Sequence, residues 1–270
     1  MNHQRAPGAG AAHRSKLRRA AAPTGSAVPS QPPTQNLTTS IVNDLGVAIV
    51  TGKYSEQNPF PVEGVLCKQY KVSRSVLREA VKMLTAKGLL KARPRQGTWV
   101  QREEHWNLLD PDVLRWMLER KFSLRLLIEF TQIRLAVEPG AAALAARAAG
   151  PAEQARVMHG IERMLAADRG EDDPLDSDIA FHSAVLRASG NPFYAQLCEL
   201  IETALRFSIR RTNSYKGVKF ASVLDHKRVA DAILAGDAAG AERSMRALIQ
   251  EALDLMLAEE RKRRRDKRSA

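Results

Sequence analysis

The sequence predicts a mainly α-helical protein, in which an N-terminal winged helix-turn-helix precedes a C-terminal all-α helical bundle. Apolar residues recur at helical spacing along most of the 270-residue chain. Only residues 89–92 and 97–100 have the pattern of short strands. No apolar run approaches the roughly 20 residues needed to cross a bilayer. The sequence therefore excludes a membrane-spanning protein and predicts a cytoplasmic one. Two distant cysteines, Cys67 and Cys198, exclude a disulfide framework and a four-cysteine zinc site.

Positive charge is concentrated in the first third of the chain and at both ends. The formal net charge is +12. Residues 1–35 contain basic side chains and no acidic one, and residues 261–270 are almost entirely basic. The first segment is rich in Ala, Pro, Gly and Ser, so it cannot bury enough apolar surface to order itself. Both tails either attract phosphate groups or are merely solvated. The acid-free composition of the first tail also resembles an organellar transit peptide.

Three short helices are predicted in the basic first third. The first covers residues 41–50, and the second is opened by Pro61, which suits the first helical position. The third follows Ser73, whose hydroxyl can accept an N–H of the first turn, and it ends at Gly88. The side chains expected on the buried face of the second helix are Val62, Val65 and Leu66. Those expected on the buried stripe of the third are Leu77, Ala80, Val81 and Leu84.

The opposite surface of the third helix has the composition of a helix that reads DNA. Its first turns present arginine and serine side chains, which can contact base edges and phosphates in the major groove. An ordinary solvated basic face is the alternative. Two short strands follow and flank a tip formed by Arg93, Pro94, Arg95 and Gln96. Three helices followed by a basic hairpin form a winged helix-turn-helix, which favours DNA binding over the solvated face.

Residues from about 37 to 100 resemble the DNA-binding domain of the GntR family of bacterial transcription regulators. The stretches that carry this resemblance are Phe60-Pro61-Val62-Glu63, Val72-Ser73-Arg74-Ser75-Val76-Leu77-Arg78-Glu79-Ala80, Lys87-Gly88-Leu89-Leu90 and Gly97-Thr98-Trp99-Val100. The resemblance implies that the residues contacting DNA are Ser73, Arg74, Ser75 and Arg78, with Gly97 at the wing. Many members have an arginine where this chain has Gly64, so one expected contact is missing.

The rest of the chain predicts an all-α domain of six or seven helices. Pro111, preceded by Asp110, opens one helix. The other expected helices cover residues 123–149 (strained or broken near Pro139-Gly140), 151–168, 174–189, 192 to about 212, 222–235, and 237 to the basic tail. The organisation expected from these elements is a disordered basic tail (1–35), a DNA-binding domain (36–104), a linker with its helix (105–122), a helical domain (123–258) and a second basic tail (259–270).

Three polar residues of the helical region suggest a metal site. Asp178 and His182 are separated by one helical turn and so project from one face. With His226, near the start of another helix, they form a ligand set that suits a divalent transition metal such as zinc. The alternative is an exposed i, i+4 ion pair and an unrelated histidine.

Residues from about 123 to 258 resemble the effector domain of the FadR branch of the same family. The stretches that carry this resemblance are Ile133-Arg134-Leu135-Ala136-Val137-Glu138-Pro139, 178–182, 189–192, 225–233 and 236–241. The resemblance implies that Asp178, His182 and His226 hold a metal. A fourth ligand of metal-binding members is replaced by Leu248. Arg134 is the residue expected to bind the carboxylate of an effector. The alternative is that Arg134 forms a surface ion pair with Glu138, one helical turn later.

Residues 106–116 resemble the linker of regulators of sugar-acid catabolism, particularly D-galactonate-responsive ones. The resemblance implies a homodimeric repressor that binds a palindromic double-stranded DNA operator and is released by a small carboxylate. A metal-dependent helical hydrolase that uses Asp178, His182 and His226 is a second interpretation. No further carboxylate or nucleophile motif accompanies these three residues, which disfavours an enzyme. A nonspecific nucleic-acid binder driven by the tails is a third.

Overall fold

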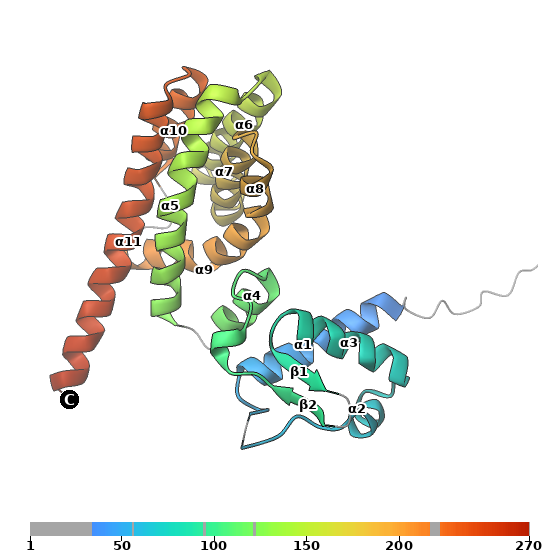
Figure 1. Ribbon diagram of the computed structural model, residues 1–270. Helices are drawn as coiled ribbons and strands as arrows, with labels where there is room; N and C mark the ends of the chain where they lie inside the picture. Colours follow the sequence, from blue (N-terminus) through green and yellow to red (C-terminus); the bar gives the residue numbers. More distant parts are fainter. Residues whose placement is uncertain (1–33, 56, 94–95, 121–122, 217–221, 270) are drawn as a thin grey trace, which may run out of the picture. The chain divides into compact units, whose positions relative to one another are not determined.

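The computed structural model describes residues 34–55, 57–93, 96–120, 123–216 and 222–269. The described part is predominantly helical, with one two-stranded sheet, as the sequence predicts (Figure 1). Residues 1–33 of the predicted disordered tail and the wing residues Pro94 and Arg95 lie outside the described residues, whereas residues 34 and 35 of that tail are helical. Within the described chain, every helix is too short or too polar to span a bilayer.

The first third contains three helices and the hairpin around one apolar core. These elements are α1 (Thr34–Val50), α2 (Glu63–Tyr70), α3 (Arg74–Ala86), β1 (Leu90–Arg93) and β2 (Gly97–Val100). The strands are antiparallel, with Leu90 opposite Val100 and Arg93 opposite Gly97. The side chains at the centre of this core are fully buried; they include Leu45, Leu66, Leu77, Leu84 and Leu89. The winged helix-turn-helix predicted from the sequence is thus present.

Two predictions about the first helices are wrong in detail. α1 begins at Thr34 rather than residue 41, because its added turns are polar except for Leu37, which is 41% exposed. Val62 and Val65 are not on the buried face of α2: their exposed fractions are 72% and 53%. Val62 is the N-cap of this eight-residue helix, and Leu66 is its one buried residue. A helix of two turns covers the core with a single side chain.

α3 is built as the sequence predicts. Ser73 Oγ accepts the backbone N–H of Val76 at 3.4 Å, which caps the helix. Of the predicted stripe, Leu77, Ala80 and Leu84 are buried, and Val81 is only partly buried. The chain leaves the helix through Gly88, which has a φ of 78° and lies so close to the carbonyl oxygen of His105 that a Cβ would be 2.2 Å from it. Both observations require glycine at this position.

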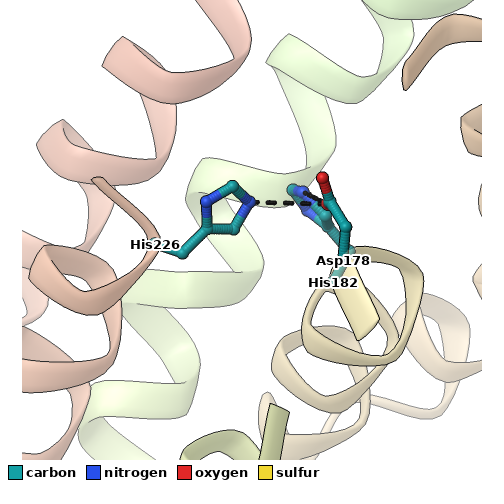
Figure 2. A group of neighbouring side chains, drawn as sticks. All are labelled: Asp178, His182 and His226. Carbon is teal, nitrogen blue, oxygen red and sulfur yellow. Dashed lines mark ion pairs between the residues drawn. The ribbon is translucent and has the colours of Figure 1, made fainter. Parts of the chain in front are cut away.

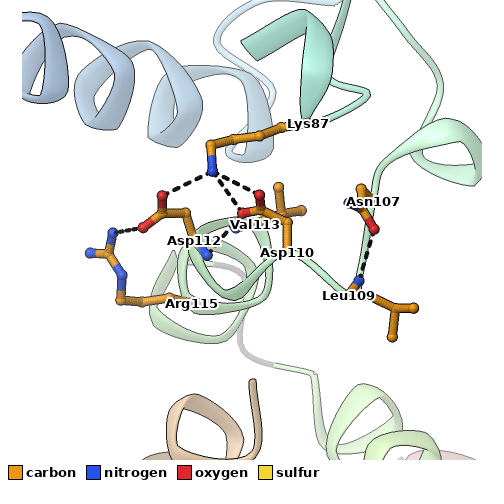
Figure 3. Close-up of polar contacts among 7 residues, drawn as sticks. All are labelled: Lys87, Asn107, Leu109, Asp110, Asp112, Val113 and Arg115. Atoms are coloured by element: carbon orange, nitrogen blue, oxygen red, sulfur yellow. Dashed lines mark hydrogen bonds and ion pairs between the residues drawn. The ribbon is translucent and has the colours of Figure 1, made fainter. Parts of the chain in front are cut away.

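α4 (Pro111–Arg120) is tied to the end of α3 by charged side chains. Asp110 caps the helix by accepting the N–H groups of Asp112 and Val113 at 3.0 and 3.2 Å. The Lys87 ammonium lies 2.8 Å from Asp110 and 3.0 Å from Asp112 (Figure 3). Trp116 of α4 is buried in the core of the first third, where its indole N–H donates to Asn43 of α1 at 2.8 Å. α4 and its charged start therefore pack against the core of the first third.

The remaining helices form the predicted all-α region. They are α5 (Leu124–Ala148), α6 (Pro151–Asp168), α7 (Pro174–Ala188), α8 (Pro192–Gln196), α9 (Cys198–Lys216), α10 (Val223–Leu234) and α11 (Ala238–Ser269). α5 packs lengthwise against α11 and also contacts α7, α9 and α10 (Figure 1). Its buried side faces two apolar clusters, one centred on α9 and the other on α6, α7 and α10. α5 is thus the central helix of this region.

Two helix predictions for this region are corrected by the structure. α5 continues through Pro139, which is buried in the middle of the helix. Packing on both sides outweighs the local cost of the proline. The single helix expected from residue 192 to about 212 is instead α8 and α9, which are separated at Leu197, where the backbone N–H turns back to Tyr194. The basic C-terminal segment extends α11, with ion pairs between Glu259 and Arg263 and between Glu260 and Arg264.

Candidate metal centre and nucleic-acid interface

Asp178, His182 and His226 meet in the interior of the helical region. The first two come from α7 and the third from the first turn of α10. Asp178 Oδ1 lies 3.3 Å from His182 Nε2 and 3.4 Å from His226 Nε2, and all three residues are at most 2% exposed (Figure 2). Each residue contributes a ligand atom to a group whose members lie within 4.8 Å of one another. The exposed ion pair considered as an alternative for Asp178 and His182 is therefore wrong.

The two helices that carry these ligands are positioned by close local contacts. Gly160 of α6 lies against Phe181 of α7 so closely that a Cβ would be 2.9 Å from the Phe181 Cα. Phe181 is fully buried and packs edge-on against both imidazoles, with ring centroids 5.7 Å from His182 and 5.1 Å from His226. At the start of α10, Ser222 caps the helix. The ligand set is therefore held by packing as well as by helical spacing.

The hydrogen bonds of the two imidazoles direct their Nε2 atoms toward Asp178. His226 Nδ1 lies 2.8 Å from the Ser222 carbonyl oxygen, and a carbonyl only accepts, so Nδ1 is the protonated nitrogen. His182 Nδ1 likewise donates to Glu138 Oε2 at 2.5 Å. In neutral imidazoles this leaves the Nε2 lone pairs facing a carboxylate oxygen. Accordingly, Asp178 Oδ1 and His226 Nε2 are buried without a hydrogen-bond partner. Converging lone pairs without protons fit a cation.

Glu138 belongs to the buried cluster, although the sequence suggests only a surface pair with Arg134. Its Oε1 accepts the Nε–H of Arg134 at 2.5 Å, while Oε2 accepts from His182. The predicted i, i+4 pair between Arg134 and Glu138 exists, but it is not a surface pair: the side chains are 5% and 1% exposed. Arg134 and Glu138 have the spacing of an ordinary surface pair. Only the tertiary packing of α5 against α7 and α11 shows that they are buried.

Charges inside the cluster control its protonation. Burial acts to raise the pKa of Glu138, but Arg134 and His182 outweigh it and lower this pKa to about 2. Burial also acts to raise the pKa of Asp178, but the two histidines outweigh it and hold this pKa well below its ordinary value. Burial acts to lower the pKa of His182, but Glu138 and Asp178 raise it to about 9. Two carboxylates and one guanidinium leave one net negative charge, which one proton on the histidines balances and a divalent cation reverses.

A cavity of about 60 Å³ opens beside the cluster. Its polar lining includes Arg134, the three ligand residues, Ser208, Ser222 and Glu251. The rest of its wall comes from apolar side chains of α9 and α11. Leu248 lies on that wall, at the place where the resemblance implies a fourth ligand, and a leucine offers no ligand atom. The cavity therefore joins a cationic group, a candidate metal centre and a mainly apolar surface.

The predicted DNA-contacting residues of α3 lie together on its exposed face. Ser73, Arg74 and Ser75 are exposed at the N-terminal end, where the hydroxyl groups of the two serines are 2.8 Å apart. Arg78 follows one turn later, with 61% of its side chain exposed, and its Nε lies 3.1 Å from Glu63 Oε1. This face presents guanidinium and hydroxyl groups while the opposite face fills the core.

The wing differs by one residue from the prediction. Arg93 belongs to β1 and pairs with Gly97, whereas the sequence placed it in the tip. Its guanidinium lies over the Trp99 ring, 5.7 Å from the centroid, which holds the arginine against the sheet. Gly97 has a φ of 89°, so the turn into β2 suits glycine. Arg95 lies outside the described residues.

Comparison with known proteins gives matches in both regions. The profile of the bacterial regulatory proteins of the gntR family matches residues 37–100, and that of the FCD domain matches residues 129–251. The galactonate operon transcriptional repressor of Escherichia coli is 34% identical over 217 residues, which are 80% of this chain and 95% of that protein. The putative L-lactate dehydrogenase operon regulatory protein of Escherichia coli is 30% identical, covering 69% of this chain and 73% of that protein.

The fold agrees with a solved relative. The structure of Lar, reported to control the expression of the agr system of Listeria monocytogenes, matches with a TM-score of 0.53 and 17% identity, covering 82% of this chain and 97% of that one. The relatives named above are transcription regulators, and this removes the hydrolase interpretation of Asp178, His182 and His226. The chain belongs to the GntR family of bacterial regulatory proteins and is a DNA-binding transcription regulator with a helical FCD domain, not an enzyme.

Proposed function

We propose that this regulator is a homodimeric repressor that leaves a palindromic operator when a small carboxylate, such as D-galactonate, binds the helical domain. The observation that carries this proposal is the cavity in which Arg134 lies beside Asp178, His182 and His226. A guanidinium and a three-ligand cation site together suit an acid that carries hydroxyl groups near its carboxylate. A dimer supports a palindrome because each winged helix-turn-helix reads one half-site.

The three ligands fit a divalent ion such as zinc. Two imidazole nitrogens and one carboxylate oxygen are usual zinc ligands, and Asp178 Oδ1 and His226 Nε2 have no competing hydrogen bond. Three protein ligands leave a coordination position for water or an effector oxygen. When bound, the ion supplies Lewis-acid attraction for such an oxygen. The chain's own residues hold the imidazoles in the tautomer that presents Nε2.

Arg134 supplies the second anchor. Among the described residues it donates only its Nε–H, to Glu138, so both Nη groups are available to an anion in the cavity. Arginine binds carboxylates with two parallel hydrogen bonds, and such charge-assisted bonds are stronger than neutral ones. The Arg134–Glu138 pair orients the guanidinium without using all of its donors.

The size of the cavity sharpens the choice of effector. Pockets for small molecules usually measure about 300–1,000 Å³, whereas this cavity measures about 60 Å³. It accommodates a carboxylate head, so a six-carbon sugar acid requires its walls to move. A shorter 2-hydroxy acid such as L-lactate is the second candidate, and the cavity volume favours it. The relatives regulate operons named for galactonate and for L-lactate dehydrogenase.

At the other end of the chain, we propose that Ser73, Arg74, Ser75 and Arg78 contact the operator, with the wing adding Arg93, Arg95 and Gly97. The support is the shared exposed face of the α3 residues and the position of Arg93 on the hairpin. The side chains that fill the core from α3 are on the opposite face, so operator contacts do not compete with folding.

The test is release of the operator by a series of acids of increasing length. The operator complex is titrated with L-lactate, D-galactonate and D-galacturonate, and fluorescence anisotropy reports bound DNA. One of these acids is expected to release wild-type protein, and Arg134→Ala is expected to bind operator but to resist release. Arg125→Ala is the matched control, because Arg125 lies on the same helix in an exposed i, i+4 pair with Glu129. Normal release of Arg134→Ala, or release by none of the acids, contradicts the proposal.

A further inference from the structure

Glu138 is the residue that connects the cation site to the anion-binding arginine. It lies near the middle of α5 and is 1% exposed. One carboxylate oxygen accepts from Arg134, one turn earlier, and the other accepts from His182 of α7, each at 2.5 Å. Both oxygens are therefore used, and each contacts a different half of the candidate effector site.

The bond to His182 sets which imidazole nitrogen is free. An ionised carboxylate accepts hydrogen bonds only, so it selects the tautomer with the proton on Nδ1. In the neutral imidazole, which is the form that binds a cation, His182 Nε2 keeps its lone pair and points at Asp178, 3.3 Å from Oδ1. Carboxylates that hold a ligating histidine this way raise its basicity, and losing one typically costs about 10–100-fold in metal affinity.

The bond to Arg134 links the metal to the anion through charge. With Glu138 and Asp178 ionised and Arg134 protonated, the cluster has one net negative charge, so a divalent cation reverses its sign. Glu251, an exposed carboxylate of α11, also lines the cavity, so the lining is neutral overall once the cation is bound. The cation thus removes the repulsion of an entering anion, which Arg134, held through Nε, faces with its Nη groups. Because binding coupling is reciprocal, an anion that binds better beside the cation must also tighten the cation.

We propose that Glu138 is a positioning residue that couples the two ligands, so that a divalent cation at Asp178, His182 and His226 and a carboxylate at Arg134 bind with positive cooperativity. This inference rests on the proposed function, because it requires both ligands to share the cavity. It adds a residue and a quantitative consequence: neither ligand reaches its full affinity alone, and the cation loses affinity when Glu138 loses its charge.

The test measures Zn²⁺ affinity directly, without DNA. Full-length protein competes with a chromophoric chelator for Zn²⁺ in 100 mM chloride or in 100 mM acetate of equal ionic strength, acetate being small enough to enter the cavity. Acetate is expected to tighten Zn²⁺ binding to wild-type protein by at least about fivefold, the lower end of usual coupling. Glu138→Gln is expected to weaken Zn²⁺ binding by about 10–100-fold. Glu129→Gln, on the exposed side of the same helix, is the matched control and is expected to behave as wild type.

A second measurement needs no variant and so does not depend on whether Glu138→Gln folds. Nitrogen-15 spectra of histidine side chains in the zinc-loaded wild-type chain are expected to show His182 with its proton on Nδ1 and zinc on Nε2. The opposite arrangement overturns the role of Glu138.

The outcomes separate this inference from the proposed function. Wild-type protein that binds Zn²⁺ equally well with and without acetate, or Glu138→Gln that equals wild type, overturns the coupling while leaving the proposed repressor intact. Protein that binds no Zn²⁺ overturns both the coupling and the cation part of the proposed function, whereas release of the operator by an acid is still measured separately.

Discussion

The two regions of this regulator have cores of different composition. Among the described residues, the core of the first third contains only apolar side chains, and every buried polar or charged residue lies between positions 131 and 226. These buried residues are Thr131, Arg134, Glu138, Ser177, Asp178, His182, Ser183, Ser189, Ser208 and His226. An apolar core is stabilised by the burial of its side chains and needs no ligand to balance a charge. A core that buries charges needs each charge to be balanced, which ties its stability to ligands.

The same pair of residue types shows the difference most directly. Arg78 and Glu63 form an ion pair at 3.1 Å with side chains 61% and 43% exposed, while Arg134 and Glu138 form one at 2.5 Å with side chains 5% and 1% exposed. Water screens the first pair, so its partners can separate cheaply and engage other groups. Water is excluded from the second, so neither partner can be removed without leaving a buried charge. One pair suits a surface that binds DNA, and the other suits a fixed frame around a ligand.

The largest expected effect is the loss of the buried pair. Glu138→Leu leaves Arg134 without its partner and removes the hydrogen bond to His182, so the free energy of unfolding is expected to fall by about 3–5 kcal/mol. Urea unfolding followed by far-ultraviolet circular dichroism measures this change. Glu63→Leu, which removes the carboxylate of the exposed pair, is expected to leave the unfolding midpoint almost unchanged. Equal midpoints for the two variants contradict the distinction between the pairs.

A smaller effect is expected at the charged start of α4, which is intermediate between these two environments. Lys87 is 13% exposed and contacts Asp110 and Asp112 (Figure 3), so Lys87→Met is expected to cost about 1.5–3 kcal/mol of stability. Burial acts to raise the pKa of Asp112, but Arg115 and Lys87 outweigh it and lower this pKa below its ordinary 3.8. Burial acts to lower the pKa of Lys87, but Asp110 and Asp112 outweigh it and raise this pKa.

The direction of these shifts predicts a pH dependence. A carboxylate with a lowered pKa contributes stability above its ordinary pKa and loses it as pH falls through its folded value. Wild-type protein is therefore expected to lose more stability than Lys87→Met as pH falls below 3.8. At the alkaline end, the contribution of Lys87 is lost as pH rises through its raised pKa, above 10.5. Parallel stability curves for the two proteins across both windows contradict this account.

The sequence predicted the elements that have local signals. α6 has the predicted bounds, Pro151–Asp168, because a proline suits its first turn and glycine and charged residues follow its end. The cap of α3 by Ser73 and the grouping of Asp178 with His182 were predictable for the same reason, since both depend on spacing within one helix. The proximity of His226 to Asp178 and His182 was predicted from the resemblance to the family, because spacing along the chain does not show it.

The missed features depend on contacts between helices. Spacing shows that Arg134 and Glu138 share a face of α5, but it does not show that α7 covers that face and brings His182 to Glu138. Val62 and Val65 are apolar yet exposed, because α2 is too short to bury more than Leu66. Leu197 separates two helices without glycine or proline, so nothing in the local sequence marks the break.

The smallest structural effect, with a specific functional one, is expected at Arg78. Its neighbours Leu77 and Ala80 fill the core, while Arg78 projects to solvent, so Arg78→Ala is expected to leave the unfolding midpoint unchanged. If Arg78 reads a base, operator affinity falls by roughly tenfold to a hundredfold, and discrimination is lost at one operator position. If it contacts only phosphate, affinity falls uniformly for all sequences and the salt dependence becomes shallower by about one unit.

Glu63 gives a sharper version of this test, because its carboxylate already binds the guanidinium of Arg78 and would compete with the operator if Arg78 contacts DNA. Glu63→Gln removes the ion pair and one negative charge near the proposed interface, so operator affinity is expected to rise modestly, most at low salt, where the exposed pair is strongest. In the Arg78→Ala variant there is no guanidinium for Glu63→Gln to release. The substitution then raises operator affinity only by removing the repulsion between Glu63 and phosphate, so the effects of the two substitutions are not additive. Anisotropy titrations of wild type, both single variants and the double variant at two salt concentrations measure the coupling. Full additivity at both concentrations means that Arg78 stays with Glu63 and does not contact the operator.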